Sequence, residues 1–162
     1  MRLLTHYHEI STHEAFHIAP LGIMLRATLF PEANMQHKRI LIVDDETVIA
    51  EELAEFLESF DYVCATAFSV DEAEDAVESN PDITLIMTDM RMPGRNGAEL
   101  ITSLKSRPDR QFEYVMISGH LDADQSLEDI KGDDLTLMRK PIDINALLAY
   151  LENLSFANGF SG

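Results

Sequence analysis

The sequence has one cysteine, no tryptophan and few basic residues, and these shortages exclude several classes of protein. The single Cys64 cannot form an internal disulfide framework, so a reducing cytoplasm is the simplest setting for the chain. No segment is both long and apolar enough to span a membrane. With 12 basic and 29 acidic side chains, the net charge is −17, which repels nucleic acid and anionic lipid. We therefore expect a cytoplasmic protein that binds neither DNA nor a membrane directly.

The acidic surplus lies entirely after residue 38. Residues 1–38 carry three basic and three acidic side chains, so the whole excess belongs to residues 39–162. The first 37 residues also lack a sustained helical or strand pattern, and they have neither the basic start nor the cleavage site of a signal peptide. We expect residues 1–37 to be a poorly ordered extension, residues 38–155 to be one compact domain, and residues 156–162 to be a short tail.

From residue 39 onward, short apolar runs alternate with amphipathic segments. The apolar runs predict strands at residues 39–43, 62–68, 83–89, 114–118 and 135–140. The amphipathic segments predict helices at residues 47–60, 69–80, 97–106, 121–132 and 144–154. Strands separated by helices of this length form βαβ units. We therefore expect an α/β fold with a doubly wound, five-stranded parallel sheet and helices on both faces.

Local sequence also predicts how three of these helices begin or pack. Ser69 and Glu72 have the spacing of a capping box. Asp143 is placed to cap the last helix. The apolar positions of the first helix predict an inner side made of Val48, Leu53, Phe56, Leu57 and Phe60.

Polar side chains stand at the predicted carboxyl ends of four strands, where the apolar runs do not require them. They are Asp44, Asp45, Asp89, Ser118 and Lys140. The carboxyl ends of parallel strands meet at one edge of a sheet, so we expect one shared crevice. Three carboxylates about 5 Å apart repel by roughly 3 kcal/mol per pair at an effective dielectric near 20. Such a cluster needs protonation or a cation, and its oxygen ligands suit Mg²⁺, while a lysine suits a phosphoryl oxygen.

Four segments of the chain, LIVDDE, MTDMRMPGRNG, MISG and MRKP, together resemble the receiver domain of two-component response regulators. The resemblance covers residues 38–155 and implies a flavodoxin-like fold with sheet order 2-1-3-4-5. It implies that Asp89 is the phosphoacceptor, and that Mg²⁺ is held by Asp44, Asp45, Asp89 and the backbone carbonyl of Arg91. The metal ion would neutralise charge on the transferring phosphoryl group.

The same resemblance assigns roles to the other side of the crevice. Lys140 would pair with one phosphoryl oxygen, and the Ser118 hydroxyl would move to bond another. The Lys140–Pro141 bond is expected to be cis. Pro93 and Gly97 would shape the loop after the phosphoacceptor. The side chains of Arg91 and His120 would stand where the family tunes the access of water to the phosphoryl group.

The resemblance also implies partners. The phosphoryl donor would be a sensor histidine kinase or a histidine phosphotransfer protein, in a two-component system or a phosphorelay. The chain would be a phosphoacceptor that assists its own Mg²⁺-dependent phosphorylation and dephosphorylation, rather than an enzyme with a separate substrate. Because only a short tail follows the last predicted helix, we expect a stand-alone receiver whose changed surface is read by a downstream protein.

One residue departs from the family pattern. The family usually has an aromatic residue three positions before the lysine of the fifth strand, where this chain has Leu137. That aromatic side chain normally moves as the hydroxyl moves, so the usual coupling to the output is in doubt. An alternative function is therefore a protein-interaction module with the receiver fold that works without phosphorylation.

Three other enzyme motifs fit the sequence less well than the receiver pattern. HEAFH, at residues 13–17, fits the H-E-x-x-H zinc protease motif, but the segment lacks a strong helical pattern and a surrounding domain. A haloacid-dehalogenase-type phosphatase needs a second aspartate two positions after the nucleophile, where this chain has Arg91. A phosphate-binding loop of the G-x-x-x-x-G-K-[ST] type is absent.

Deleting residues 1–34 is expected to leave both folding and phosphorylation intact, because the βα pattern and the predicted site lie beyond them. Thermal melting and a phosphorylation assay on the truncated chain test this. A loss of more than a few degrees in melting temperature would show that the segment packs on the domain.

Overall fold

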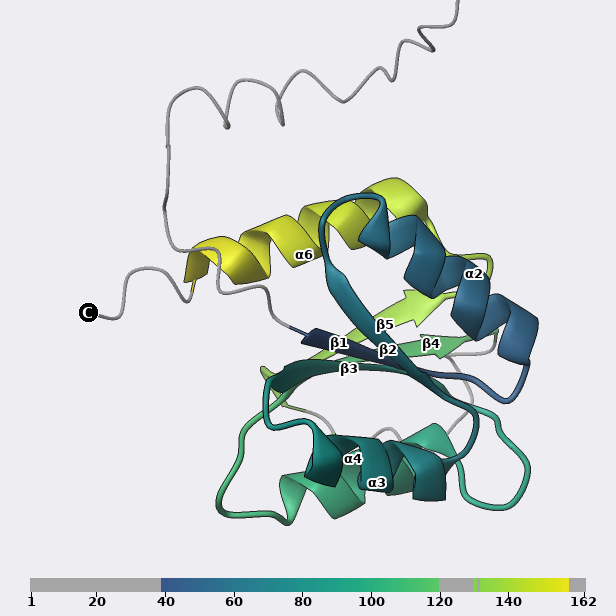
Figure 1. Ribbon diagram of the computed structural model, residues 1–162, viewed down its shortest axis with the longest axis vertical. Helices are drawn as coiled ribbons and strands as arrows, with labels where there is room; N and C mark the ends of the chain where they lie inside the picture. The colour runs from purple at the N-terminus through teal and green to yellow at the C-terminus, as the bar shows by residue number, and fades with distance from the viewer. Residues whose placement is uncertain (1–38, 120–129, 131, 158–162) are drawn as a thin grey trace, which may run out of the picture. The chain divides into compact units, whose positions relative to one another are not determined.

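The computed structural model describes residues 39–119, 130 and 132–157, and these residues form a sheet between two layers of helices (Figure 1). The strands are β1 (Arg39–Val43), β2 (Val63–Ala67), β3 (Ile83–Asp89), β4 (Glu113–Ser118) and β5 (Leu135–Arg139). The helices are α2 (Thr47–Glu58), α3 (Val70–Ser79), α4 (Gly97–Lys105) and α6 (Ile144–Ala157). Neighbouring strands are parallel in the order β2-β1-β3-β4-β5, which confirms the predicted doubly wound fold. The predicted extension at 1–37 and most of the predicted helix 121–132 lie outside the described residues, as does the predicted tail 156–162 from residue 158 onward. The first two residues of that predicted tail belong to α6, which continues to Ala157.

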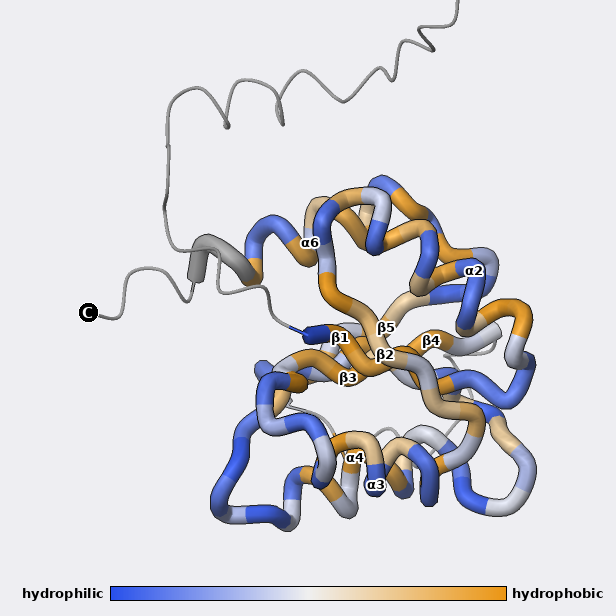
Figure 2. The backbone as a smooth tube through the Cα atoms, in the orientation of Figure 1, coloured by the Kyte–Doolittle hydropathy of each residue, from blue (hydrophilic) through white to orange (hydrophobic). Residues whose placement is uncertain are grey.

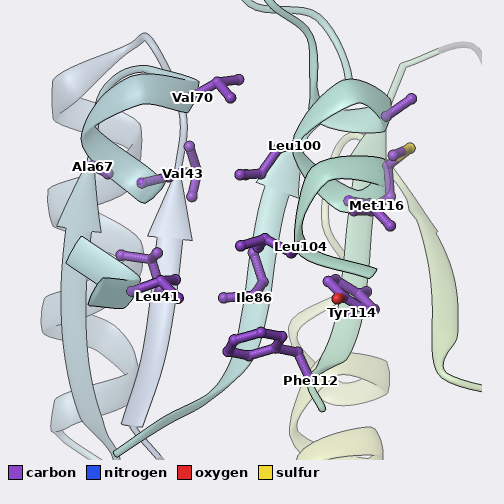
Figure 3. Close-up of a cluster of buried hydrophobic side chains, with 14 of the residues drawn as sticks. Leu41, Val43, Ala67, Val70, Ile86, Leu100, Leu104, Phe112, Tyr114 and Met116 are labelled. Atoms are coloured by element: carbon purple, nitrogen blue, oxygen red, sulfur yellow. The ribbon is translucent and has the colours of Figure 1, made fainter. Parts of the chain in front are cut away.

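The sheet is apolar on both faces because alternate side chains of each central strand face opposite helix layers. In β1, Ile40 and Ile42 pack in the cluster that contains α2 and α6, whereas Leu41 and Val43 pack in the cluster that contains α3 and α4. Figure 2 shows the strands coloured as hydrophobic along most of their length. Figure 3 shows the second cluster, in which side chains of β1 and β3 lie beside those of α3 and α4.

The prediction for the inner side of α2 is wrong at Val48, and the predicted Phe60 lies beyond the end of the helix at Glu58. Val48 is 62% exposed, while the buried residues of the helix are Ala50, Leu53, Ala54 and Leu57. At 100° per residue, Val48 lies about 200° around the helix from Ala50 and so faces away from the sheet. Small alanines at the buried positions let the helix lie close to the strands.

The helix starts also differ in part from the prediction. At α3, the Ser69 hydroxyl accepts a hydrogen bond from the Glu72 N–H at 3.2 Å, but the Glu72 carboxylate accepts from Phe68 N–H, not from Ser69. The reciprocal half of the predicted capping box is therefore displaced by one residue. A complete capping box, not predicted from the sequence, starts α4: Asn96 and Glu99 each accept from the other's backbone N–H.

Arg110 joins the end of α3 to the start of β3. Its guanidinium donates hydrogen bonds to the backbone carbonyls of Val77, Asn80, Pro81 and Ile83. The same group lies 4.7 Å from the centre of the Phe112 ring. A guanidinium presents five donors in a fixed planar arrangement, so it can satisfy several converging carbonyls at once.

Replacing Arg110 by alanine is expected to lower the free energy of unfolding by about 2–4 kcal/mol, because several carbonyls lose a charged donor. Arg107→Ala is the matched control, since Arg107 pairs at 3.3 Å with Glu78, whose side chain is 66% exposed. Such an exposed pair contributes at most about 1 kcal/mol. Urea unfolding of both variants tests the difference, and equal losses would contradict the assigned role of Arg110.

Candidate functional site

The register of the parallel strands brings the predicted site residues to one edge of the sheet. Val43 pairs with Thr88, and Ser118 pairs with Arg139, so β1, β3, β4 and β5 end at similar heights. Asp89 itself is the last residue of β3. The strand ends that carry the predicted site residues therefore lie along one edge of the sheet, as the sequence led us to expect.

Three carboxylates converge at this edge. Asp44, Asp45 and Asp89 each place one oxygen within 4.8 Å of the other two. Asp44 and Asp89 are buried, with exposures of 5% and 8%, whereas Asp45 is exposed and leaves the cluster open to solvent on one side. Close, oxygen-only ligands with an open side fit Mg²⁺, which keeps several of its waters when bound to protein.

Backbone N–H groups hold the two buried carboxylates in position. The Glu46 N–H donates to Asp44 Oδ1 at 2.9 Å, and the Arg91 N–H donates to Asp89 Oδ2 at 3.1 Å. These bonds restrict rotation of both side chains and so fix where their oxygens lie.

Lys140 supplies the cation of the site. Its Nζ lies 3.0 Å from Asp89 Oδ1 and 3.2 Å from Asp44 Oδ2. Burial alone would lower the pKa of Lys140, but the hydrogen bonds and negative charges of Asp89 and Asp44 outweigh it, so its pKa is raised. The ammonium therefore stays charged at neutral pH and offsets part of the repulsion between the two buried carboxylates.

The turn after β5 presents this lysine. The Lys140–Pro141 peptide bond is cis, as predicted from the sequence. The Lys140 N–H donates to the Ser118 carbonyl at 2.9 Å, which extends the β4–β5 ladder by one bond. Asp143 then caps α6, as predicted, by accepting from the N–H groups of Asn145 and Ala146.

The start of helix α4 lies against the main chain of Asp89 and fixes its position. A Cβ atom on Gly97 would lie 2.3 Å from the Asp89 carbonyl oxygen, so only glycine fits at the start of α4. The Thr88 hydroxyl donates to the same carbonyl at 3.0 Å. The Gly97 N–H donates to the Met90 carbonyl at 3.2 Å, which closes the loop of residues 90–96 at its base.

The structure describes some of the remaining predicted site residues but not all of them. Ser118 is 2% exposed at the end of β4, and the side chain of Arg91 is exposed. Leu137, at the departure from the family pattern, is 37% exposed on β5. His120 and the HEAFH segment lie outside the described residues. Sequence reasoning missed Arg95, whose loop position gave no signal that it pairs with carboxylates of α3.

Comparisons with known proteins show which family this fold belongs to. A family model described as the response regulator receiver domain matches residues 40–152. The two-component response regulator PprB of Pseudomonas aeruginosa is 32% identical over 121 residues, which are 74% of this chain and 44% of that protein. The response regulator receiver protein Anae109_2439 of Anaeromyxobacter sp. is 36% identical over 112 residues, which are 68% of this chain and 46% of that protein.

Solved structures show the same fold. A response regulator receiver protein from Pseudomonas putida superposes with a TM-score of 0.66 at 24% identity, over 72% of this chain and 97% of that chain. A CheY-like receiver domain from Methanospirillum hungatei JF-1 gives a TM-score of 0.64 at 26% identity, over 77% and 98% of the two chains.

The match to the family model spans the sheet from the second residue of β1 onward and includes the carboxyl ends of all its strands. The chain spans less than half the length of these two curated relatives. Within residues 39–119, 130 and 132–157, no helix has the length and apolar character needed to cross a membrane. The chain belongs to the receiver-domain family of two-component response regulators.

Proposed function

We propose that this protein accepts a phosphoryl group on Asp89 from a phosphohistidine donor and signals through the surface change that follows. The observation that carries the proposal is the cluster of three carboxylates within 4.8 Å, with the Lys140 ammonium 3.0 Å from Asp89. An exposed side of the cluster gives a donor protein access, while burial of Asp89 keeps its carboxylate away from bulk water.

The proposed transfer is a single displacement at phosphorus. An Asp89 carboxylate oxygen attacks the phosphorus atom, and an acyl phosphate forms. The P–N bond of the phosphohistidine breaks, its electron pair goes to the ring nitrogen, and the donor's imidazole, protonated on the other nitrogen, leaves as neutral histidine. Asp44, Asp45, Asp89 and the backbone carbonyl of Arg91 would hold Mg²⁺, which when bound neutralises charge on the phosphoryl group. The Arg91 N–H and the Lys140 ammonium already contact Asp89, so they hold the nucleophile in place before the donor arrives.

Phosphorylation changes the charge balance of the site. A phosphoryl group brings nearly two negative charges to a crevice that already holds three carboxylates. Lys140 would pair with one phosphoryl oxygen and give up part of its contact with Asp44, while the Ser118 hydroxyl would bond another oxygen. Such a rearrangement biases an existing two-state equilibrium toward one conformation.

The partners follow from this chemistry. The donor would be a sensor histidine kinase or a histidine phosphotransfer protein, and a separate protein would read the changed surface. The strong negative charge argues against direct contact with nucleic acid, and the single cysteine is consistent with a cytoplasmic setting. We assign this role to a receiver domain at residues 38–155, flanked by an extension at 1–37 and a tail at 156–162.

Acetyl phosphate with Mg²⁺ is expected to add one phosphoryl group to the wild-type protein, and Asp89→Asn is expected to abolish it, because an amide oxygen is a far weaker nucleophile than a carboxylate. Intact-mass measurement, before and after alkaline treatment, detects the labile acyl phosphate. Asp109→Asn is the control, since Asp109 is exposed and remote from the site. Wild-type modification of the Asp89→Asn variant would refute the assignment.

Lys140→Met is expected to lower the free energy of unfolding at pH 7 without Mg²⁺ by about 2 kcal/mol, since two buried carboxylates lose their counter-charge. The pKa of Lys140 is raised in the folded state, so its contribution is fully present below the ordinary lysine pKa of about 10.4. It is lost as the pH rises through the higher folded value.

Urea unfolding of wild type and Lys140→Met from pH 7 to pH 11 measures this contribution. The difference between them should stay constant to about pH 10 and shrink above it. In an Asp44→Asn/Asp89→Asn background, the same lysine substitution should cost little. An unchanged cost in that background would mean that the ammonium stabilises the fold through other contacts.

A further inference from the structure

Arg95 connects the loop after Asp89 to helix α3. Its guanidinium donates to both carboxylate oxygens of Glu74, each at 2.9 Å, and to Asp71 Oδ1 at 2.9 Å. The Ser103 hydroxyl of α4 donates to Glu74 Oε1 at 2.6 Å. Glu74 is therefore shared by the loop, by α3 and by α4, which lie side by side on one face of the sheet (Figure 1).

The Arg95–Glu74 ion pair has features that make it more stabilising than an ordinary surface ion pair. Most exposed salt bridges contribute little to stability. Here the guanidinium binds the carboxylate with two parallel bonds, and the Glu74 side chain is only 21% exposed. The hydrogen bond from Arg95 lowers the pKa of Glu74 to about 2, against the opposing effect of burial. The pair therefore persists across the physiological pH range.

The loop of residues 90–96 is attached to the fold at its first residue, where the Met90 N–H donates to the Ile117 carbonyl at 2.9 Å, and at further points along its length. Its base is closed by the Gly97 N–H to Met90 carbonyl bond, and the Met92 side chain packs in the core. Arg91, Pro93 and Gly94 are exposed, and Gly94 adopts a φ of +78°. In the second half of the loop, the Asn96–Glu99 capping box joins the chain to α4, and the contacts of Arg95 join it to α3.

We infer that Arg95 is a positioning residue for the phosphoacceptor site. By anchoring the loop to Glu74 and Asp71, it holds the main chain of Arg91 against Asp89. The inference rests on the proposed function. Arg91 lies two residues from Asp89, donates its N–H to the carboxylate at 3.1 Å, and would offer its carbonyl to Mg²⁺. A loop released from α3 would sample other conformations, so both groups would be in place for a smaller fraction of the time.

A purely structural role of Arg95, as a clamp between α3 and α4, predicts something different. In that case, its loss would lower stability and leave the metal site unchanged. Arg107 offers a matched comparison, because it also forms an ion pair with a glutamate of α3, Glu78. Arg107 comes just after the last residue of α4, whereas Asp89 lies near the first residue of that helix.

The experiment compares Arg95→Gln, Arg95→Lys and Glu74→Gln with the control Arg107→Gln in the full chain. Mg²⁺ affinity is measured from backbone amide NMR shifts of residues 89–92 during MgCl₂ titration. Amide hydrogen exchange at Arg91 and Met92 without Mg²⁺ reports loop opening independently of metal binding. Phosphoryl lifetime after acetyl phosphate treatment is the third readout.

Arg95→Gln and Glu74→Gln should weaken Mg²⁺ binding about 10-fold, as for other residues that support metal ligands from behind, and should speed exchange at both amides. Arg95→Lys keeps the charge without the bidentate geometry, so it should fall between wild type and Arg95→Gln. Arg107→Gln should leave the affinity and the exchange at wild-type values. Equal effects of Arg95→Gln and Arg107→Gln, or wild-type values in both, would overturn the inference. A wild-type protein that takes no phosphoryl group would refute the proposed function instead, while amide exchange would still decide the role of Arg95.

Discussion

The placement of two buried carboxylates beside one ammonium is the constraint on which the rest of this site depends. Asp44 and Asp89 lie within reach of the same Lys140 Nζ, at 3.2 and 3.0 Å. Two buried negative charges at such distances are tolerable only with a nearby cation and with donors on the remaining oxygens. The parallel register of β1, β3 and β4, together with the turn after β5, brings these groups together. The core on both faces of the sheet gives that register its stability.

The loop behind Asp89 shows how backbone geometry supports the chemistry. Gly97 lets the start of α4 approach the Asp89 carbonyl, where any side chain would collide. The Asn96–Glu99 capping box satisfies the first N–H groups of the same helix. Arg95 then joins the loop to α3. Each of these three features acts on the position of the main chain. Together they control where the Arg91 N–H lies relative to the Asp89 carboxylate.

The charge distribution places the site in a strongly negative field. Among the described residues, many of the cations are paired with carboxylates, as in Arg39 with Asp82 and Lys105 with Asp134. Helix α2, which follows Asp44 and Asp45, contains four glutamates and no basic residue. Such a surface attracts divalent cations and repels free phosphate and other anions. The field therefore favours metal loading, whereas a phosphoryl group needs a donor or a local cation such as Lys140.

The sequence by itself determined the sheet order through its family resemblance, the doubly wound architecture, and the strand ends at which Asp44, Asp89 and Lys140 stand. The architecture and the strand ends follow from local patterns, because apolar runs and helix periodicity need no knowledge of distant contacts, whereas the sheet order is what the resemblance implied. Val48 was misplaced because a valine in an amphipathic segment gives no indication of which side of the helix meets the sheet until the helix is docked. Only the tertiary structure decided that Arg95 pairs with Glu74, 21 residues earlier. The physical reason is that a long charged side chain takes its partner from the packing of separate elements, which no local pattern records.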